Sequence, residues 1–169
     1  MKIENSDLSD ISKIFELYRT ATEYMKSKNQ VHWPEFSKDL IINEIEENRQ
    51  WKLLIDGQIA CIWATTFNDE LIWEDRNNDP AVYIHRIAIN PDFRGQNLVK
   101  KLFAWAGEFG KKNHLSYIRM DTVGLNRGLI DHYKKVGFEF LGTRKLKNTI
   151  GLPNHYKDGE VCFFHKQII

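Results

Sequence analysis

The fold of this chain is decided by the stretch Tyr83-Ile84-His85-Arg86-Ile87-Ala88-Ile89-Asn90-Pro91-Asp92-Phe93-Arg94-Gly95-Gln96-Asn97-Leu98. It begins as an apolar, β-branched run that predicts a buried strand, passes through a short turn with Arg94-Gly95, and ends where an amphipathic helix starts. Such a turn points unpaired backbone N–H groups and the positive end of a helix dipole at one spot. A phosphate or pyrophosphate fits there, although an ordinary strand-to-helix turn has the same pattern.

Two common phosphate-binding motifs do not match this turn. The nucleotide-triphosphate loop is excluded because no Gly-Lys-Ser/Thr follows, and the dinucleotide fingerprint is excluded because its three glycines are missing. The turn therefore indicates an anion site of another kind.

The rest of the chain surrounds this unit with strands and helices. Upstream, the spacing of apolar residues predicts a helix over 11–25, capped by Asp7 or Ser9, and a second helix after Ser37. The Asp56-Gly57 hairpin signal predicts strands at 51–55 and 58–67 on either side of it. An acidic, turn-rich segment follows at 68–80, in which we expect 71–73 to pair at a strand end. From the quoted stretch onward we expect strands at 81–89, 116–122, 138–144 and 160–166, and helices over 97–112 and 126–136, the last ended by Gly137 in a left-handed cap. This order implies an α/β fold (α+β by a stricter label), a mixed central sheet with helices on both faces, in a single domain spanning residues 1–169.

Composition excludes several classes of function. The chain has 169 residues, 24 basic against 23 acidic, so its net charge of +1 gives no field for nucleic acid or for an anionic membrane. No apolar run is long enough to cross a bilayer, and the N-terminus has no secretory pattern. Cys61 and Cys162 stand alone in apolar stretches, as expected of free buried thiols in a reducing compartment. We therefore expect a cytoplasmic protein.

Two segments together resemble a known family. Residues 83–98 resemble the acetyl-CoA-binding motif of the Gcn5-related N-acetyltransferases (GNAT), and the later residues Asp121-Thr122, Asn126, Leu129, Tyr133 and Gly137-Phe138 look like that family's second half-motif at the expected spacing. The resemblance covers about residues 80–142 closely and the rest only through the order of elements. It implies a mostly antiparallel sheet of six to seven strands flanked by about four helices.

The resemblance implies direct transfer of an acetyl group from the co-substrate acetyl-CoA to a primary amine of a small molecule or peptide. In this family the phosphate turn reads Arg/Gln-x-x-Gly-x-Gly/Ala, whereas Asn97 and Val99 occupy the two small positions here. Asparagine tolerates left-handed backbone, so Asn97 can keep the turn, while the branched side chain of Val99 crowds it. An acyl-CoA-binding or regulatory domain with weak or no turnover is therefore the alternative function.

The cofactor residues follow from the same resemblance. The pyrophosphate cradle comprises Gly95, Gln96, Asn97, Leu98, Val99 and Lys100, with Arg94 either assisting or lying on the surface; the pantetheine arm is bound by backbone groups of Ile87 and Ile89 and by Asn126. Asn126 can also cap its helix, and these two roles do not exclude each other.

Tyr133 and His85 are the candidate catalytic residues. Tyr133 lies two helical turns after Asn126 and is expected to protonate the departing CoA thiolate, the alternative being a core tyrosine. His85, with an ordinary pKa near ~6.5, is suited to removing the proton of the amine, although a merely packed histidine is as compatible.

The acceptor side of the site has no motif. Glu74 and Asp75 are further candidates for the base or for a sensor of substrate charge, and Trp33 and Trp73 are candidates for the wall of an acceptor pocket. We expect no metal, because the histidines and cysteines show no metal-ligand spacing. The sequence leaves open the acceptor amine and whether the protein forms a homodimer.

Overall fold

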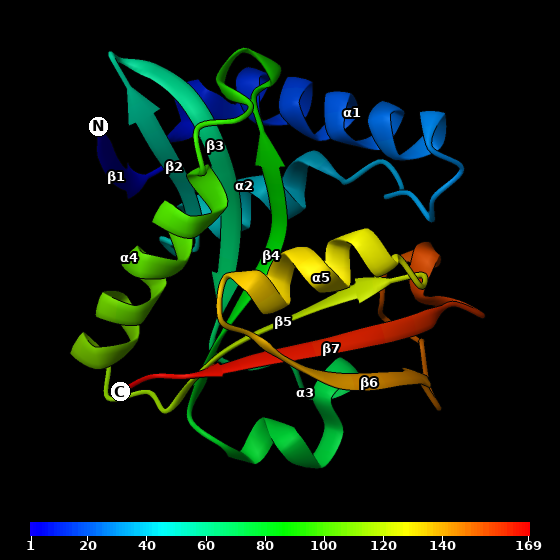
Figure 1. Ribbon diagram of the computed structural model, residues 1–169. Helices are drawn as coiled ribbons and strands as arrows, with labels where there is room; N and C mark the ends of the chain where they lie inside the picture. The colour runs from blue at the N-terminus through cyan, green and yellow to red at the C-terminus, as the bar shows by residue number, and fades with distance from the viewer.

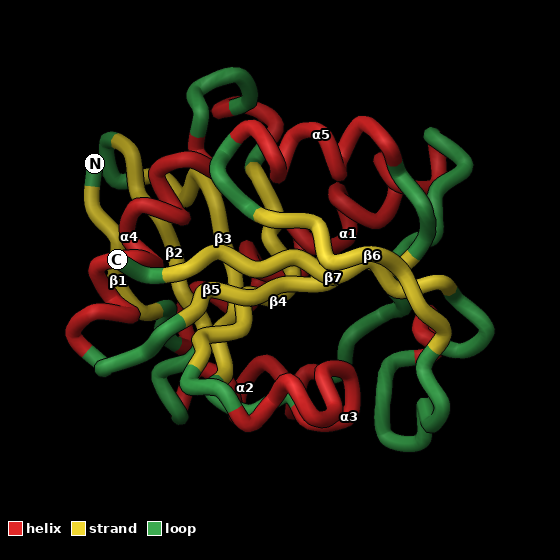
Figure 2. Tube along the Cα trace, turned by 60° about the horizontal axis from the view of Figure 1, so that its bottom comes forward, coloured by secondary structure: helices red, strands yellow, loops and turns green.

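The computed structural model describes all 169 residues, and seven strands in one sheet form its centre (Figures 1 and 2). The strands are β1 (Lys2–Asn5), β2 (Gln50–Ile55), β3 (Gln58–Thr66), β4 (Ala81–Ile89), β5 (Tyr117–Val123), β6 (Glu139–Lys145) and β7 (Glu160–Gln167). They lie in the order β1-β2-β3-β4-β5-β7-β6, and only the β4–β5 pair is parallel.

Five helices cover the two faces of this sheet: α1 (Ile11–Ser27), α2 (Lys38–Glu46), α3 (Glu70–Trp73), α4 (Leu98–Lys112) and α5 (Arg127–Lys135). Alternate residues of a strand point to opposite faces. On β4, Val82 and Ile84 pack with α4 and α5 in the largest of three hydrophobic clusters, the main core, whereas Ala81 and Tyr83 pack in another with α3. A third core joins α1 and α2 to Ile62 on β3, whose neighbours in sequence face the α4 side. Hence α4 and α5 cover one face, and α1, α2 and α3 cover the other.

The helix ends follow from short capping signals. Ser37 accepts the N–H of Leu40 and starts α2. Asp7 caps a 3₁₀ turn over Leu8–Asp10 that leads into α1. Gly137 follows α5 with a φ of +94°, a left-handed conformation that glycine adopts without strain. The predicted signals at Ser37 and Gly137 are confirmed. The predicted cap of α1 is not, since Asp7 caps the 3₁₀ turn and the N-cap residue of α1 is Asp10, whose side chain makes no capping bond.

Strands β4 and β5 separate after a short paired region. Their pairing runs only from Ala81 to Tyr83 on β4, against Tyr117 to Arg119 on β5. Beyond it β4 stays paired with β3 while β5 stays paired with β7, and the two strands diverge in Figure 1. The sheet therefore opens in its middle, between the C-terminal halves of β4 and β5.

A bulge in β4 lies at the opening. Ile62 pairs with Ala88 and Ala64 with His85, so Trp63 alone faces two residues, Arg86 and Ile87. Arg86 takes up the extra residue in left-handed backbone with a φ of +51°. The bulge shifts the alternation by one position, so that Ile87 packs on the α4 side, as Ile84 does before it.

The fold class, the mostly antiparallel sheet of seven strands and the helices on both faces confirm the expectations from the sequence. The structure has five helices where about four were expected, and it adds the edge strand β1. The prediction that 71–73 pairs at a strand end is wrong, since these residues form α3. No helix combines the length and apolar character that a bilayer crossing requires.

Candidate active site

A cleft of about 1190 Å³ occupies the opening between β4 and β5. Its lining includes residues from both faces of the sheet, so it passes from the α4 and α5 side to the α1 and α3 side. Among its lining residues are His85, Arg86 and Ile87 on β4, Met120, Asp121 and Thr122 on β5, Asn126 and Tyr133 at α5, and Trp33, Glu44, Asp69 and Tyr156 from the other face.

The predicted phosphate turn lies in the loop before α4. Gly95 has a φ of +80° with open space where a side chain would stand, and Asn97 has a φ of +55°. Asn97 thus adopts the left-handed backbone that was expected of it. The N–H of Lys101 donates to the Asn97 carbonyl at 3.2 Å as the first helical bond. The N–H groups of Leu98, Val99 and Lys100 therefore have no acceptor within the helix.

The side chains around this turn point in different directions. Leu98 is buried, and Val99 is half-buried against the main core, so its branched side chain packs inward. Gln96 and Lys100 are exposed. The guanidinium of Arg94 lies 4.9 Å from the ring centre of Tyr24 on α1. The exposed surface of the turn thus consists mainly of backbone and of basic and amide groups.

Of the two predicted backbone contacts on β4, Ile87 lines the cleft, whereas Ile89 lies beyond it and pairs with Cys61. The side chains of both residues pack against the main core. Because no strand pairs with β4 on its β5 side here, the peptide groups along that edge are free to bond a ligand.

Tyr133 packs in the main core and also lines the cleft. Its ring packs edge-on against Phe103 and Phe164, with centroids 6.2 and 5.1 Å away, and only 8% of the residue is exposed. Burial, and secondarily the nearby Cys61 thiol, raises the pKa of the phenol. No hydrogen bond counters this rise, so the hydroxyl stays protonated across the neutral range and can serve as a proton donor.

Asn126 lies at the start of α5 and lines the same cleft. Its Oδ1 accepts the N–H of Leu129 at 3.1 Å, so it caps the helix as expected. This bond leaves its amide NH₂ group available to a ligand.

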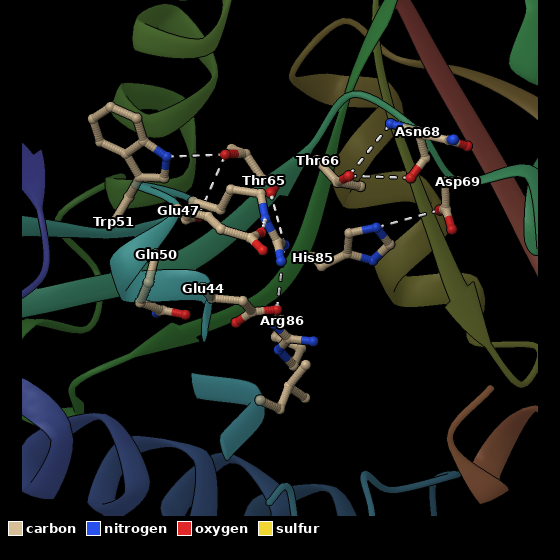
Figure 3. A network of polar contacts seen from close by, with 12 residues as sticks. Glu44, Glu47, Gln50, Trp51, Thr65, Thr66, Asn68, Asp69, His85 and Arg86 are labelled. Carbon is tan, nitrogen blue, oxygen red and sulfur yellow. Dashed lines mark hydrogen bonds and ion pairs between the residues drawn. The ribbon is translucent and has the colours of Figure 1, made fainter. Parts of the chain in front are cut away.

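His85 points toward Asp69, the residue before α3 (Figure 3). The imidazole Nε2 lies 3.3 Å from Asp69 Oδ2. Burial and the positive charge of Arg86 lower the pKa of His85. The adjacent Asp69 carboxylate and the negative charge of Asp121 raise it, and these two effects are the stronger. The net effect raises the pKa of His85 above its ordinary value.

Asp121 on β5 is the third charged group at this point. Its Oδ2 accepts the hydroxyl of Tyr156 at 2.7 Å, while its Oδ1 is buried without a hydrogen-bond partner. Burial and the negative charge of Asp69 raise its pKa to about 6, against the opposing effects of His85 and Tyr156. One ligand-type atom from each of Asp69, His85 and Asp121 lies within 4.8 Å of the others, and we call these three residues the DHD cluster.

A second charged network holds Arg86 at the bulge. Its guanidinium donates to Glu44 Oε1 and lies 5.1 Å from the ring centre of Phe36. Arg49 also approaches Glu44, at 3.7 Å, and pairs with Glu47. Both arginines of this part of the cleft are therefore already paired with carboxylates.

Three of the residues predicted for the acceptor side, Trp73, Glu74 and Asp75, lie outside the cleft. Trp73 is fully buried between Tyr83 and Phe163, so it forms core and not a pocket wall. Glu74 pairs with Arg144 at 3.2 Å and, like Asp75, lines a separate surface cavity of about 440 Å³. Only Trp33 of the predicted acceptor residues lines the cleft, packed edge-on against Tyr18.

Sequence reasoning did not assign roles to several residues of this site. Asp69 lay unnoticed in the acidic segment, and Tyr156 lay in the long loop before β7. Spacing along the sequence does not reveal the DHD cluster, because its members come from three separate segments. No local pattern links them, and only the divergence of β4 and β5 brings them together.

Comparisons with known proteins agree with this geometry. The model of the acetyltransferase (GNAT) family matches residues 11–138. The chain is 26% identical over 161 residues to the uncharacterized N-acetyltransferase YesJ of Bacillus subtilis, covering 83% of this chain and 89% of that protein. It is also 26% identical over 148 residues to the uncharacterized N-acetyltransferase MJ1207 of Methanocaldococcus jannaschii, covering 81% of this chain and 60% of the relative.

Solved structures show the same fold. A GNAT-family acetyltransferase from Listeria monocytogenes superposes with a TM-score of 0.79 at 23% identity, over 98% of this chain and 94% of that one. The putative acetyltransferase yncA from Salmonella typhimurium, solved with its cofactor acetyl-CoA, gives a TM-score of 0.70 at 15% identity, over 100% and 94% of the two chains. The seven-stranded sheet with its flanking helices is thus the fold of these acetyltransferases. This chain belongs to the acetyltransferase (GNAT) family.

Proposed function

We propose that this protein transfers an acetyl group directly from acetyl-CoA to a primary amine of a small molecule or peptide. The observation that carries the proposal is the single cleft through the sheet, which joins Tyr133 on one face to His85 and Asp121 on the other. An acyl donor held on the α4 side and an amine entering from the α1 side can meet there without either crossing the core. Proximity of this kind removes much of the entropic barrier to a two-substrate reaction.

The free N–H groups at the start of α4 are the proposed contacts of the CoA pyrophosphate. Residues 94–97 leave backbone exposed at a helix N-terminus, where anions are stabilised by the helix dipole. The left-handed conformation of Asn97 and the inward packing of Val99 support a working turn, in spite of the two departures from the family pattern. The pantetheine arm is then proposed to bond the open edge of β4 at Ile87 and the Asn126 amide.

His85 is the proposed first acceptor of the amine proton. A primary ammonium has a pKa near ~10.4, so its proton must leave before the nitrogen can attack. The imidazole passes this proton to water, and the neutral nitrogen then forms a bond to the thioester carbonyl carbon. The Ile87 N–H is proposed to stabilise the resulting oxyanion.

Tyr133 is the proposed acid in the second half of the reaction. The C–S bond breaks as the tetrahedral adduct collapses, and the phenol protonates the departing thiolate. The second proton of the attacking nitrogen replaces the one that Tyr133 has lost. The products are the acetylated amine, CoA with a free thiol, and one proton released to solvent.

The experiment is a turnover assay on purified protein with acetyl-CoA and a panel of amines and peptides. Free thiol is followed continuously, and mass spectrometry identifies the product. An acyl-CoA-binding domain without turnover, suggested by Asn97 and Val99, would bind acetyl-CoA in a calorimeter and form no product. We further propose a cytoplasmic location, because both cysteines are buried and unpaired.

A further inference from the structure

The DHD cluster carries more negative than positive charge at the centre of the cleft. Its two carboxylates face a single imidazole: Asp69 Oδ2 has only the His85 Nε2 beside it, at 3.3 Å, and Asp121 Oδ1 is buried without a hydrogen-bond partner. Buried carboxylate oxygens are costly to leave unsatisfied. Their arrangement therefore favours a ligand that brings positive charge and N–H donors.

The position of Asp69 gives independent support. It is the N-cap residue of α3, where an aspartate ordinarily accepts a backbone N–H of the first turn, yet its side chain makes no capping bond. The carboxylate instead faces His85 at 3.3 Å. Its own N–H is held by Asn77 at 2.8 Å, which fixes the loop in this arrangement. The chain thus directs a carboxylate away from a helix end and into the cleft.

A third observation concerns Glu44, which lines the same cleft and is 3% exposed. Its Oε1 pairs with Arg86, but its Oε2 is buried without a partner. Besides Asp121 Oδ1, the cleft therefore holds a second carboxylate oxygen without a partner, and this one belongs to an almost fully buried side chain.

The positive groups of the cleft do not offer a site for an anion beside the DHD cluster. Arg86 and Arg49 are paired with Glu44 and Glu47. His155 has its pKa lowered to about 4, chiefly by burial, so it is neutral at neutral pH. Lys28 and Arg127 also line the cleft, but both are exposed at its rim.

The cleft that contains the cluster also has apolar walls. Ile72 follows Asp69 on α3, and the ring of Tyr156 is held by its bond to Asp121. Further apolar lining comes from Trp33, Phe36, Leu152 and Pro153. A substrate here has room for a hydrophobic body but no partner for a second charge.

We propose that the DHD cluster binds the acceptor as an ammonium ion between Asp69 and Asp121, and that the acceptor is a primary amine on an apolar body with no carboxylate beside the nitrogen. This inference rests on the proposed function and names its substrate class. A carboxylate on the neighbouring carbon would be repelled by Asp69 and Asp121, whereas an amide at the same place would meet no such repulsion.

The test separates binding from turnover. Calorimetry with CoA-loaded protein, which cannot react, measures the dissociation constants of three compounds of similar shape: 2-phenylethylamine, L-phenylalaninamide and L-phenylalanine. We expect the first two to bind at least tenfold more tightly than the free amino acid. Equal or tighter binding of L-phenylalanine, or no binding of any of the three, would overturn the inference.

Variants locate the site. Asp69→Asn and Asp121→Asn should each weaken binding of 2-phenylethylamine at least tenfold and bring its affinity close to that of L-phenylalanine. Binding of CoA itself should stay unchanged. The matched control is Asp39→Asn, an exposed aspartate on α2 that does not line the cleft. Preserved amine selectivity in both cleft variants would contradict the assignment.

Two further results distinguish this inference from its alternatives. Selective amine binding without any acetylated product would leave the cation site standing and refute the proposed function alone. Amine binding that is abolished by EDTA and restored by a divalent metal would show that the carboxylates hold a metal, and this would overturn the ammonium assignment.

Discussion

Tyr156 donates its hydroxyl hydrogen to Asp121 Oδ2 at 2.7 Å, and this bond ties the loop before β7 to the open end of β5. The two residues are 35 positions apart, and both line the cleft. The bond stabilises the charged form of Asp121 and so opposes the rise in its pKa that burial causes. The loop thereby helps to set the charge of the proposed amine site.

Tyr156→Phe should therefore raise the pKa of Asp121 further above about 6. Fewer molecules then carry the charged carboxylate near pH 6 to 7, so amine binding should weaken there and recover at higher pH. The measurement is the dissociation constant of 2-phenylethylamine from pH 5.5 to pH 8.5. An unchanged pH dependence would show that the Tyr156 hydroxyl does not control Asp121.

Asp121→Asn tests the cost of this buried charge for the fold. The folded-state pKa, about 6, exceeds the ordinary value of 3.8, so the folded form binds the proton more tightly than the unfolded form. The contribution of Asp121 to the free energy of unfolding is therefore fully present below pH 3.8 and is lost as the pH rises through about 6. Near pH 7.5 the variant should be more stable, by roughly 1 kcal/mol or about 2–4 °C in Tm, although it binds amine poorly. Thermal melting at pH 4.5 and pH 7.5 measures the difference, and equal shifts at both values would contradict it.

The phosphate turn can be tested with a pair of matched glycines. Gly95 and Gly57 have φ values of +80° and +78°, and both have open space around the missing side chain. Gly95→Asp and Gly57→Asp therefore introduce the same strain and charge, one at the turn and one in the β2–β3 hairpin. Acetyl-CoA should raise the Tm of the wild type and of Gly57→Asp but not of Gly95→Asp, because only the latter repels the pyrophosphate. Equal shifts in both variants would remove the turn from the site.

Asn97→Gly restores the small residue that the family pattern has at this position of the turn. The backbone there is left-handed, which glycine adopts at no cost, and the Asn97 side chain makes no capping bond. Acetyl-CoA should bind with unchanged or higher affinity in calorimetry. A large loss would reveal a specific contact of the Asn97 side chain with the ligand.

His85→Ala addresses the proposed base. Asp69 and Asp121 face the imidazole and raise its pKa above 6.5, while burial and Arg86 oppose them. The acid limb of kcat/KM in the wild type should therefore fall at a pH above 6.5, where His85 takes up a proton. The variant should not show that acid limb. Its kcat/KM should be about 10²–10⁴-fold lower than that of the wild type at neutral pH, with a smaller loss at high pH. A pH profile of the same shape in both proteins would exclude His85 as the base.

The sequence predicted the parts of the site that are local in the chain. The strand, the turn and the helix of residues 83–98 lie together because they are contiguous, and Asn126 and Tyr133 share a face of α5 because they are two turns apart. The bulge at Arg86 was not predicted, since it depends on the pairing of β4 with Trp63 on β3.

The acceptor side could not be predicted for a different reason. Asp69, His85 and Asp121 lie on three segments that no short-range pattern connects. Trp73 was predicted to line the acceptor pocket because it is aromatic, but it packs in the core against Phe163. Whether an aromatic residue lines a cavity or fills a core is decided by tertiary packing, which its neighbours in sequence do not specify.

Tyr133→Phe is the most direct test of the proposed acid. The variant keeps the ring that packs against Phe103 and Phe164 and deletes only the hydroxyl, so folding and acetyl-CoA affinity should stay close to those of the wild type. A CoA thiolate has a conjugate acid of pKa near ~8.5, by analogy with cysteine, and can leave without full protonation. Loss of the acid should therefore reduce kcat on the order of 10–10³-fold and not abolish it. Steady-state kinetics measures the effect, with melting curves as the control for folding. If the well-folded variant works within a few-fold of the wild type, Tyr133 serves packing alone and the proton for the thiolate comes from water.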